Sequence, residues 1–166
     1  MTVKSDYSPE EWKSLLVAPF FASMLVVISD MNMGFFKELA ALGQAVTLTA
    51  THTKSDLIRD IAADLSKKET QEILKPEMEK FQAQKDPQVL KGSFVDAILG
   101  AADLVSSRSS EDGVGYRKWL LYLAQQTAEG SKEGGFLGIG AVRVSEKEKA
   151  MLVELSQALG VDAPAA

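Results

Sequence analysis

Residues 134–160 have the sequence GGFLGIGAVRVSEKEKAMLVELSQALG, and no other part of the chain has a composition that so clearly requires a special backbone. Four glycines lie among bulky apolar residues, directly before a helical pattern. Ser145 and Glu148 have the spacing of a capping box, in which each side chain accepts from the other residue's backbone amide. The stretch predicts an extended apolar connection followed by a capped helix that ends near Gly160.

Helix-start signals recur outward from this stretch. Ser8-Pro9-Glu10-Glu11 combines a capping serine, proline at the first helical position and glutamate at the third. Asp86-Pro87 is a second such start, Ser55 or Thr53 is a third, and residues 66–69 have the spacing of another capping box. Between them, apolar residues recur at three- and four-residue intervals, with no strand–helix alternation. The sequence therefore predicts one all-α domain over residues 1–166, a bundle of six or seven helices with a flexible tail at 163–166.

Three features interrupt this pattern. Pro19 and Pro76 lie inside helical stretches, and each lacks an amide hydrogen, so a kink is expected near each, or a break near residues 17–18. Residues 106–115 are rich in Ser, Asp and Gly, which predicts a mobile loop. Residues 46–53, VTLTATHT, alternate like a strand, but the helices expected on either side favour the fraying end of a helix.

Two long stretches, residues 14–29 and 39–53, carry no charge. The first is apolar all round, as in a helix buried on every side, and both are shorter than the ~20 residues that cross a bilayer. Two helices at the centre of a bundle are the favoured interpretation, so a membrane partner is not expected. A membrane-inserting hairpin is the alternative.

The overall composition excludes several classes of function. The net charge of −5 argues against a nucleic-acid-binding surface. The absence of cysteine excludes disulfides, thiolate zinc sites and cysteine nucleophiles, and it fits a reducing compartment, so a cytoplasmic location is expected. No targeting signal is recognised, since acidic residues precede the apolar stretch where a positive segment would be needed.

His52 is the one histidine of the chain, so any serine-type triad would have to use it. One histidine cannot supply the paired Glu-x-x-His motifs of carboxylate-bridged di-metal bundles. Asp96 and Asp103 lie seven residues apart on one helical face, where a solvent-exposed role is favoured. We predict no catalytic residues, no metal site and no cofactor.

The glycine-rich connection allows two interpretations. Gly138, Gly140 and Arg143 precede a helix N-terminus, an arrangement that can bind an anion, and with His52 they are the ligand candidates. Alternatively, the connection is an apolar strap that packs on its own bundle or on another chain. In that case its candidate contact residues are Phe136, Leu137, Ile139 and Val142.

Residues 140–160, a short turn followed by Val-Ser-x-x-Glu and an apolar-striped helix ending in Leu-Gly, resemble the tail of TerB-like tellurite-resistance modules. They also resemble a tract of small uncharacterised bacterial all-helical proteins, in which Gly-Gly-Phe-Leu-Gly precedes the same helix. The resemblance implies a helical fold and a bacterial origin. TerB-like modules carry acidic residues before the serine, taken to bind metal, where this chain has Ala141, Val142 and Arg143.

Three functions are consistent with these features. The first is a non-enzymatic interaction or binding module, with a homodimer or an unidentified protein as partner and residues 136–144 as the surface. The second is a binder of, or an enzyme on, a small anionic or lipid-like ligand between helices. Residues 14–29 and 39–53 would line that pocket, with Arg143 or His52 at its mouth. The third is the membrane hairpin.

Overall fold

The computed structural model describes residues 1–30, 35–130 and 144–163. In these residues it has no strand, which confirms the all-α fold. A short 3₁₀ turn, η1 (Lys4–Asp6), precedes seven α-helices. These are α1 (Pro9–Ser29), α2 (Phe35–His52), α3 (Asp56–Leu65), α4 (Lys68–Ala83), α5 (Pro87–Arg108), α6 (Ser110–Gly130) and α7 (Glu146–Leu159).

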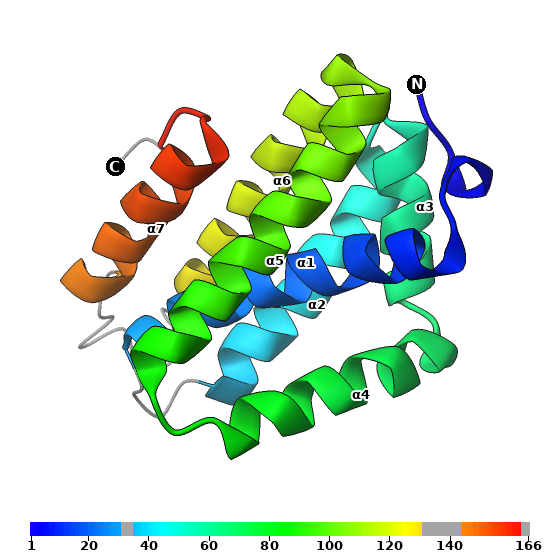
Figure 1. Ribbon diagram of the computed structural model, residues 1–166. Coiled ribbons are helices and arrows are strands. Elements are labelled where there is room, and N and C mark those ends of the chain that lie inside the picture. The colour runs from blue at the N-terminus through cyan, green and yellow to red at the C-terminus, as the bar shows by residue number, and fades with distance from the viewer. Residues whose placement is uncertain (31–34, 131–143, 164–166) are drawn as a thin grey trace.

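Helix α1 is the centre of the bundle, as the first uncharged stretch predicted. Every residue from Leu15 to Val27 is buried. Helices α5, α6 and α7 pack against α1, and α2, α3 and α4 make smaller contacts with it (Figure 1). The second uncharged stretch behaves differently. It forms α2, which buries Leu42, Ala45 and Val46 but leaves Leu48 53% exposed. Only α1 is therefore buried on all sides.

The predicted helix starts are mostly confirmed. The hydroxyls of Ser8, Ser55 and Ser145 and the carboxylate of Asp86 each accept a backbone amide at the start of a helix. A new helix does begin at residues 66–69, as the sequence suggested, but the capping box expected there is wrong. Ser66 instead ends α3, where its hydroxyl donates to the Ala62 carbonyl at 3.0 Å, and α4 begins at Lys68 without a side-chain cap.

The predicted mobile loop at residues 106–115 is also wrong. Helix α5 continues to Arg108 and α6 begins at Ser110, so only Ser109 separates two helices that pack side by side. Gly113 permits this close approach, because a Cβ on it would lie 2.7 Å from the Ser106 Cα. The polar residues that suggested a loop lie where two helices meet tightly.

Neither proline ends its helix, so the break considered near residues 17–18 does not occur. Proline has no N–H, and at position 19 it therefore leaves the Leu15 carbonyl without its intrahelical donor. The Tyr116 hydroxyl of α6 donates to that carbonyl at 2.9 Å. Leu15 and Tyr116 are both fully buried, and burial raises the pKa of the Tyr116 hydroxyl well above its ordinary value, so it stays protonated as a donor.

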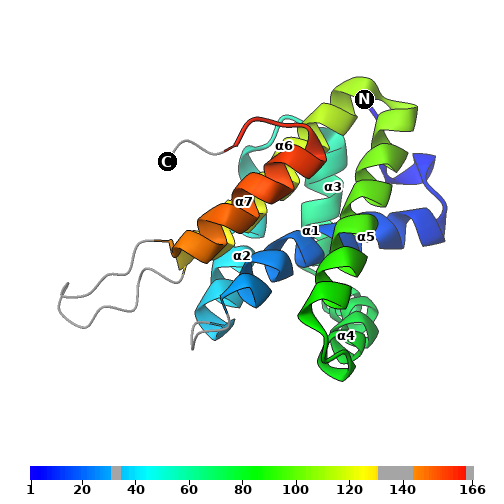
Figure 2. The same cartoon turned by 60° about the vertical axis from the view of Figure 1, so that its left-hand side comes forward.

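Helix α4 lies along one edge of the molecule, and Figure 2 shows it at the lower right, away from α7. Of its described side chains, only Thr70 is buried, while Ile73 and Leu74 are half-buried. Most of the others are exposed, as expected for a helix rich in Glu and Lys. Helix α4 therefore covers the bundle loosely, and hollows lie where it meets α1.

Candidate functional site

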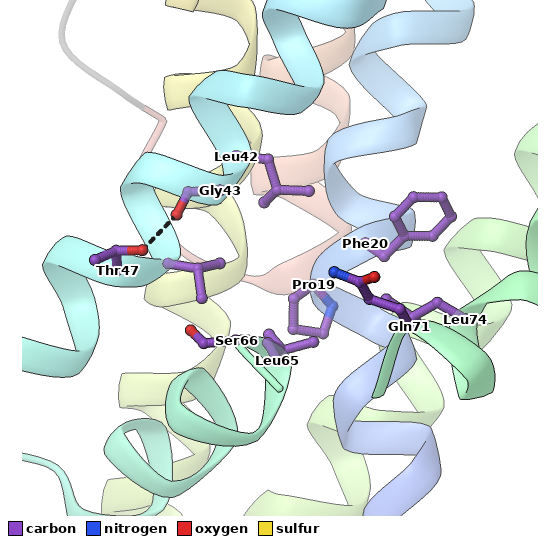
Figure 3. A pocket seen from close by; sticks show the side chains of 10 residues that line it. Pro19, Phe20, Leu42, Gly43, Thr47, Leu65, Ser66, Gln71 and Leu74 are labelled. Atoms are coloured by element: carbon purple, nitrogen blue, oxygen red, sulfur yellow. Dashed lines mark hydrogen bonds between the residues drawn. The ribbon is translucent and has the colours of Figure 1, made fainter. Parts of the chain in front are cut away.

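A pocket of about 520 Å³ lies between α1, α2 and the corner joining α3 to α4 (Figure 3). Its volume is within the ~300–1,000 Å³ typical of small-molecule sites. Ten residues line it: Pro19 and Phe20 of α1; Leu42, Gly43, Val46 and Thr47 of α2; Leu65 and Ser66 at the end of α3; and Gln71 and Leu74 of α4. The two uncharged stretches thus supply six of these residues, as the hypothesis of an inter-helix pocket anticipated.

None of the ten lining residues has an ionisable side chain. Phe20, Leu42 and Val46 form much of the wall and are each less than 10% exposed, so the pocket extends inward from the surface. Pro19 adds its ring to the same wall. The proline that removes a backbone hydrogen bond on the Tyr116 side of α1 therefore also shapes the pocket.

The polar groups of the pocket are few. The Thr47 hydroxyl donates to the Gly43 carbonyl at 2.9 Å, and the Ser66 hydroxyl donates to the Ala62 carbonyl. Both hydroxyl protons are therefore used, and both oxygens keep the capacity to accept. The Gln71 amide lies beside Pro19 and Phe20 in Figure 3, and no hydrogen bond joins it to another described residue.

Gly43 lies on the exposed side of α2, at the mouth of the pocket. A Cβ built on this glycine would meet no heavy atom within 4 Å. Gly43 lies inside α2, where glycine costs roughly 1 kcal/mol of helix propensity relative to alanine. A side chain would thus be sterically permitted here and is absent, which leaves the pocket open.

Two further hollows are more polar. One of about 360 Å³ between α1, α4 and α5 contains Lys80, which pairs with Glu77 at 3.1 Å. The other, of about 330 Å³, lies between α1, α5 and α7 and contains Lys91, which pairs with Glu154 at 2.7 Å. It also contains Lys147, which lies 3.9 Å from Asp30. Lys80 and Lys91 are the more closely paired. Since these two lysines already have carboxylate partners, neither is an unpaired cation that could attract an anionic ligand.

His52 does not line any of these three pockets. It is exposed at the end of α2, where its Nδ1 lies 2.7 Å from the Thr51 hydroxyl and 2.9 Å from the Leu48 carbonyl. Asp56, four residues on, pairs instead with Arg59 at 2.6 Å. His52 therefore has no carboxylate partner among the described residues that would make it a base.

The other predicted site residues lie outside the described residues: Gly138, Gly140 and Arg143 of the anion site, and Phe136, Leu137, Ile139 and Val142 of the interaction surface. The same holds for the expected turn at residues 31–34 and for most of the tail at 163–166. The anion site and the interaction surface stay predictions.

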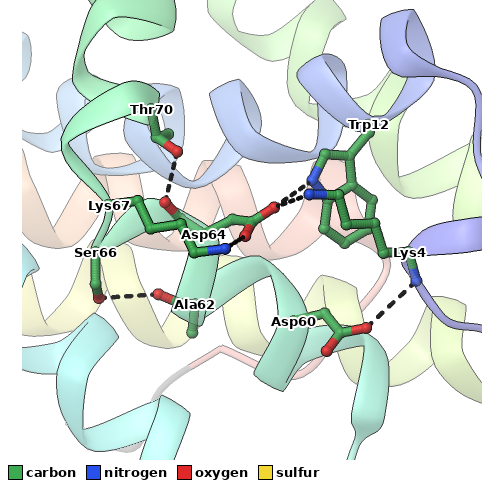
Figure 4. Close-up of polar contacts among 8 residues, drawn as sticks. All are labelled: Lys4, Trp12, Asp60, Ala62, Asp64, Ser66, Lys67 and Thr70. Atoms are coloured by element: carbon green, nitrogen blue, oxygen red, sulfur yellow. Dashed lines mark hydrogen bonds and ion pairs between the residues drawn. The ribbon is translucent and has the colours of Figure 1, made fainter.

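The most concentrated polar cluster surrounds Asp64, near the end of α3 (Figure 4). Its carboxylate accepts from Lys4 at 2.6 Å, from Lys67 at 2.6 Å and from the Trp12 indole at 2.9 Å. The Thr70 hydroxyl donates to its backbone carbonyl at 2.5 Å. These contacts join the N-terminal segment, α1 and the start of α4 to α3, so we interpret the cluster as a structural clasp.

We predict that this clasp makes the protein sensitive to acid. Burial by itself would raise the pKa of Asp64, but the hydrogen bonds from Lys4, Lys67 and Trp12 outweigh burial and lower the pKa to about 2. Because the pKa of the Asp64 carboxyl is lower in the folded protein than in the unfolded chain, where it is near 3.8, the ionised carboxylate stabilises the fold at pH values above 3.8. This stabilisation is lost as the pH falls towards 2. At neutral pH, Asp64→Asn should reduce the free energy of unfolding by about 2 kcal/mol.

Urea titrations between pH 7 and pH 2 measure this effect. The gap between the wild type and Asp64→Asn should close as the pH falls from 4 to 2, whereas Asp56→Asn, at an exposed ion pair, should change stability by less than about 0.5 kcal/mol throughout. If the difference in the free energy of unfolding stays constant down to pH 2, the negative charge of Asp64 does not contribute to the stability of the clasp.

Helix α1 also meets the length and composition of a membrane span, and among the described residues it is the only helix that does so. Within its apolar window, 72% of the residues are buried inside the bundle. Core helices and membrane-crossing helices share this composition. No group of three or more potential metal ligands occurs among the described residues.

Comparison with known proteins identifies no relative: no protein-family model, no curated protein and no solved structure matches the chain.

Proposed function

We propose that this chain is a non-enzymatic binding module that holds one small apolar ligand in the pocket between α1, α2 and the α3–α4 corner. The observation that carries the proposal is the pocket lining, which has room for a ligand and, among the described residues, no ionisable side chain. Acid–base and nucleophilic catalysis need a titratable or activated group within reach of the substrate. The same lining favours binding, because burial contributes about 0.8 kcal/mol for each CH₂ group.

The position of the pocket favours a ligand-binding site over a simple packing defect. Its inner wall belongs to α1, the most buried helix, whereas its outer edge is formed by Gln71 and Leu74 of the loosely packed α4. A ligand would therefore contact a rigid surface on one side and a helix with few core contacts on the other. Among the described side chains of α4, only Thr70 is buried, so this part of the helix adds little to the core.

A titration with the neutral fluorescent probe N-phenyl-1-naphthylamine tests the proposal. We expect saturable binding of one probe per chain, with a blue-shifted emission and a Kd of about 10–100 µM, since ordering and desolvation offset part of the gain from burial. Unlabelled 1-octanol should displace the probe. A signal that rises linearly without saturation, or one that octanol leaves unchanged, would contradict the proposal.

A further inference from the structure

The polar groups of the pocket restrict the ligand's head group. Thr47 and Ser66 use their hydroxyl protons on the Gly43 and Ala62 carbonyls, so towards a ligand they are acceptors. Among the described lining residues, Gln71 is the one whose side chain has N–H donors, and its carbonyl oxygen is a further acceptor. The described lining residues thus offer more acceptors than donors and include no cation.

This inventory discriminates between the head groups of otherwise identical ligands. A carboxylate needs several donors or a cation when it leaves water, and the amide of Gln71 replaces only part of its hydration. An ammonium would find acceptors but no carboxylate among the lining residues to neutralise it. A hydroxyl is matched on both sides, because it can donate to Thr47, Ser66 or the Gln71 oxygen and accept from the Gln71 amide.

Building on the proposed function, we infer that the ligand is an uncharged amphiphile, with an apolar body against Phe20, Leu42 and Val46 and a hydroxyl-type head at Gln71. The lining residues are placed accordingly. Phe20, Leu42 and Val46 are buried, whereas Gln71 is exposed on the outer helix. The body therefore enters the bundle first, and the head stays near the opening under α4. Of the two ligand classes that the sequence suggested for an inter-helix pocket, anionic and lipid-like, this inference favours the lipid-like one.

Three ligands with the same eight-carbon chain test the inference: 1-octanol, octanoate and octylammonium, each in competition with N-phenyl-1-naphthylamine at pH 7.5. We expect octanol to bind about three- to tenfold more tightly than either ion, because an ionic head beside the exposed Gln71 loses part of its hydration and gains only one neutral amide group. The variant Gln71→Leu should weaken octanol about three- to tenfold relative to the probe, because only octanol loses a hydroxyl partner while both ligands meet the same leucine. Gln157→Leu, on the exposed face of α7, is the matched control and should change neither.

The outcomes separate the inference from the proposed function. If the probe does not bind saturably, the proposed function is wrong. If the probe binds but octanoate or octylammonium equals octanol, the pocket is a binding site and the uncharged head group is overturned. If Gln71→Leu weakens the probe and octanol equally, Gln71 contributes only to the apolar wall, and the placement of the head is overturned.

Discussion

Replacing Tyr116 by phenylalanine should lower the free energy of unfolding by about 3 kcal/mol, although it removes a single oxygen atom. Pro19 leaves the Leu15 carbonyl without an intrahelical donor, and the Tyr116 hydroxyl supplies the missing hydrogen bond at 2.9 Å. Both residues are fully buried, so water cannot replace the hydroxyl. A buried polar group left without a partner costs roughly 1–3 kcal/mol, and the new void adds to this cost.

A double-mutant cycle with Pro19→Ala tests this explanation. Alanine restores the backbone N–H at position 19, so the Leu15 carbonyl regains its donor within α1. In that background, Tyr116→Phe should cost no more than about 1 kcal/mol, which gives a coupling energy of about 2 kcal/mol. Urea denaturation measures all four proteins under the same conditions.

Tyr122→Phe is the control for the cycle. This tyrosine lies on the same helix, α6, but is 38% exposed, and its replacement should change stability by less than about 0.5 kcal/mol. Equal costs for Tyr116→Phe in the wild-type and Pro19→Ala backgrounds would show that the hydroxyl does not compensate for the proline. The tolerance of α1 for Pro19 would then need another explanation.

The second large effect is expected at Gly43, where leucine should stabilise the protein and weaken ligand binding at least tenfold. A Cβ at this position meets nothing within 4 Å, so the side chain can enter the pocket without displacing the backbone. Leucine is also the better helix former, by roughly 0.8–1 kcal/mol, and at this exposed lining position partial burial of its methyl groups adds to that gain. We expect a gain of about 1–2 kcal/mol in the free energy of unfolding, measured by urea denaturation.

Gly100→Leu is the matched control for this substitution. Gly100 is an exposed residue inside α5 that does not line the pocket, and a Cβ on it would meet no heavy atom within 4 Å. It therefore gains the same helix propensity while the pocket stays empty. Comparing the two variants separates filling of the pocket from stabilisation of a helix.

The sequence predicted those parts of the structure that depend on neighbouring residues. The Ser8, Asp86 and Ser145 caps are local, and so is the run of apolar residues that makes α1 the central helix. The wrong predictions occur where one local sequence pattern is compatible with two different structures. A run of Ser, Asp and Gly is typical of loops, yet at residues 106–115 Gly113 serves the close packing of two helices.

The pocket could be predicted only in part. Its α1 and α2 walls come from stretches whose lack of charge is visible in the sequence, whereas Leu65 and Gln71 join them through the tertiary arrangement of α3 and α4. The Asp64 clasp was missed for the same reason. Lys67 is near Asp64 in sequence, but Trp12 and Lys4 are 52 and 60 residues away, and nothing local distinguishes this carboxylate from the exposed ones.

The most direct test of the proposed binding function is the affinity of N-phenyl-1-naphthylamine for Gly43→Leu, measured beside the wild type and Gly100→Leu. If the pocket between α1, α2 and the α3–α4 corner holds the ligand, Gly43→Leu should lose at least tenfold in affinity while remaining as stable as the wild type or more so, and Gly100→Leu should bind normally. Unchanged binding by a folded Gly43→Leu would contradict the account, because the probe would then occupy another site.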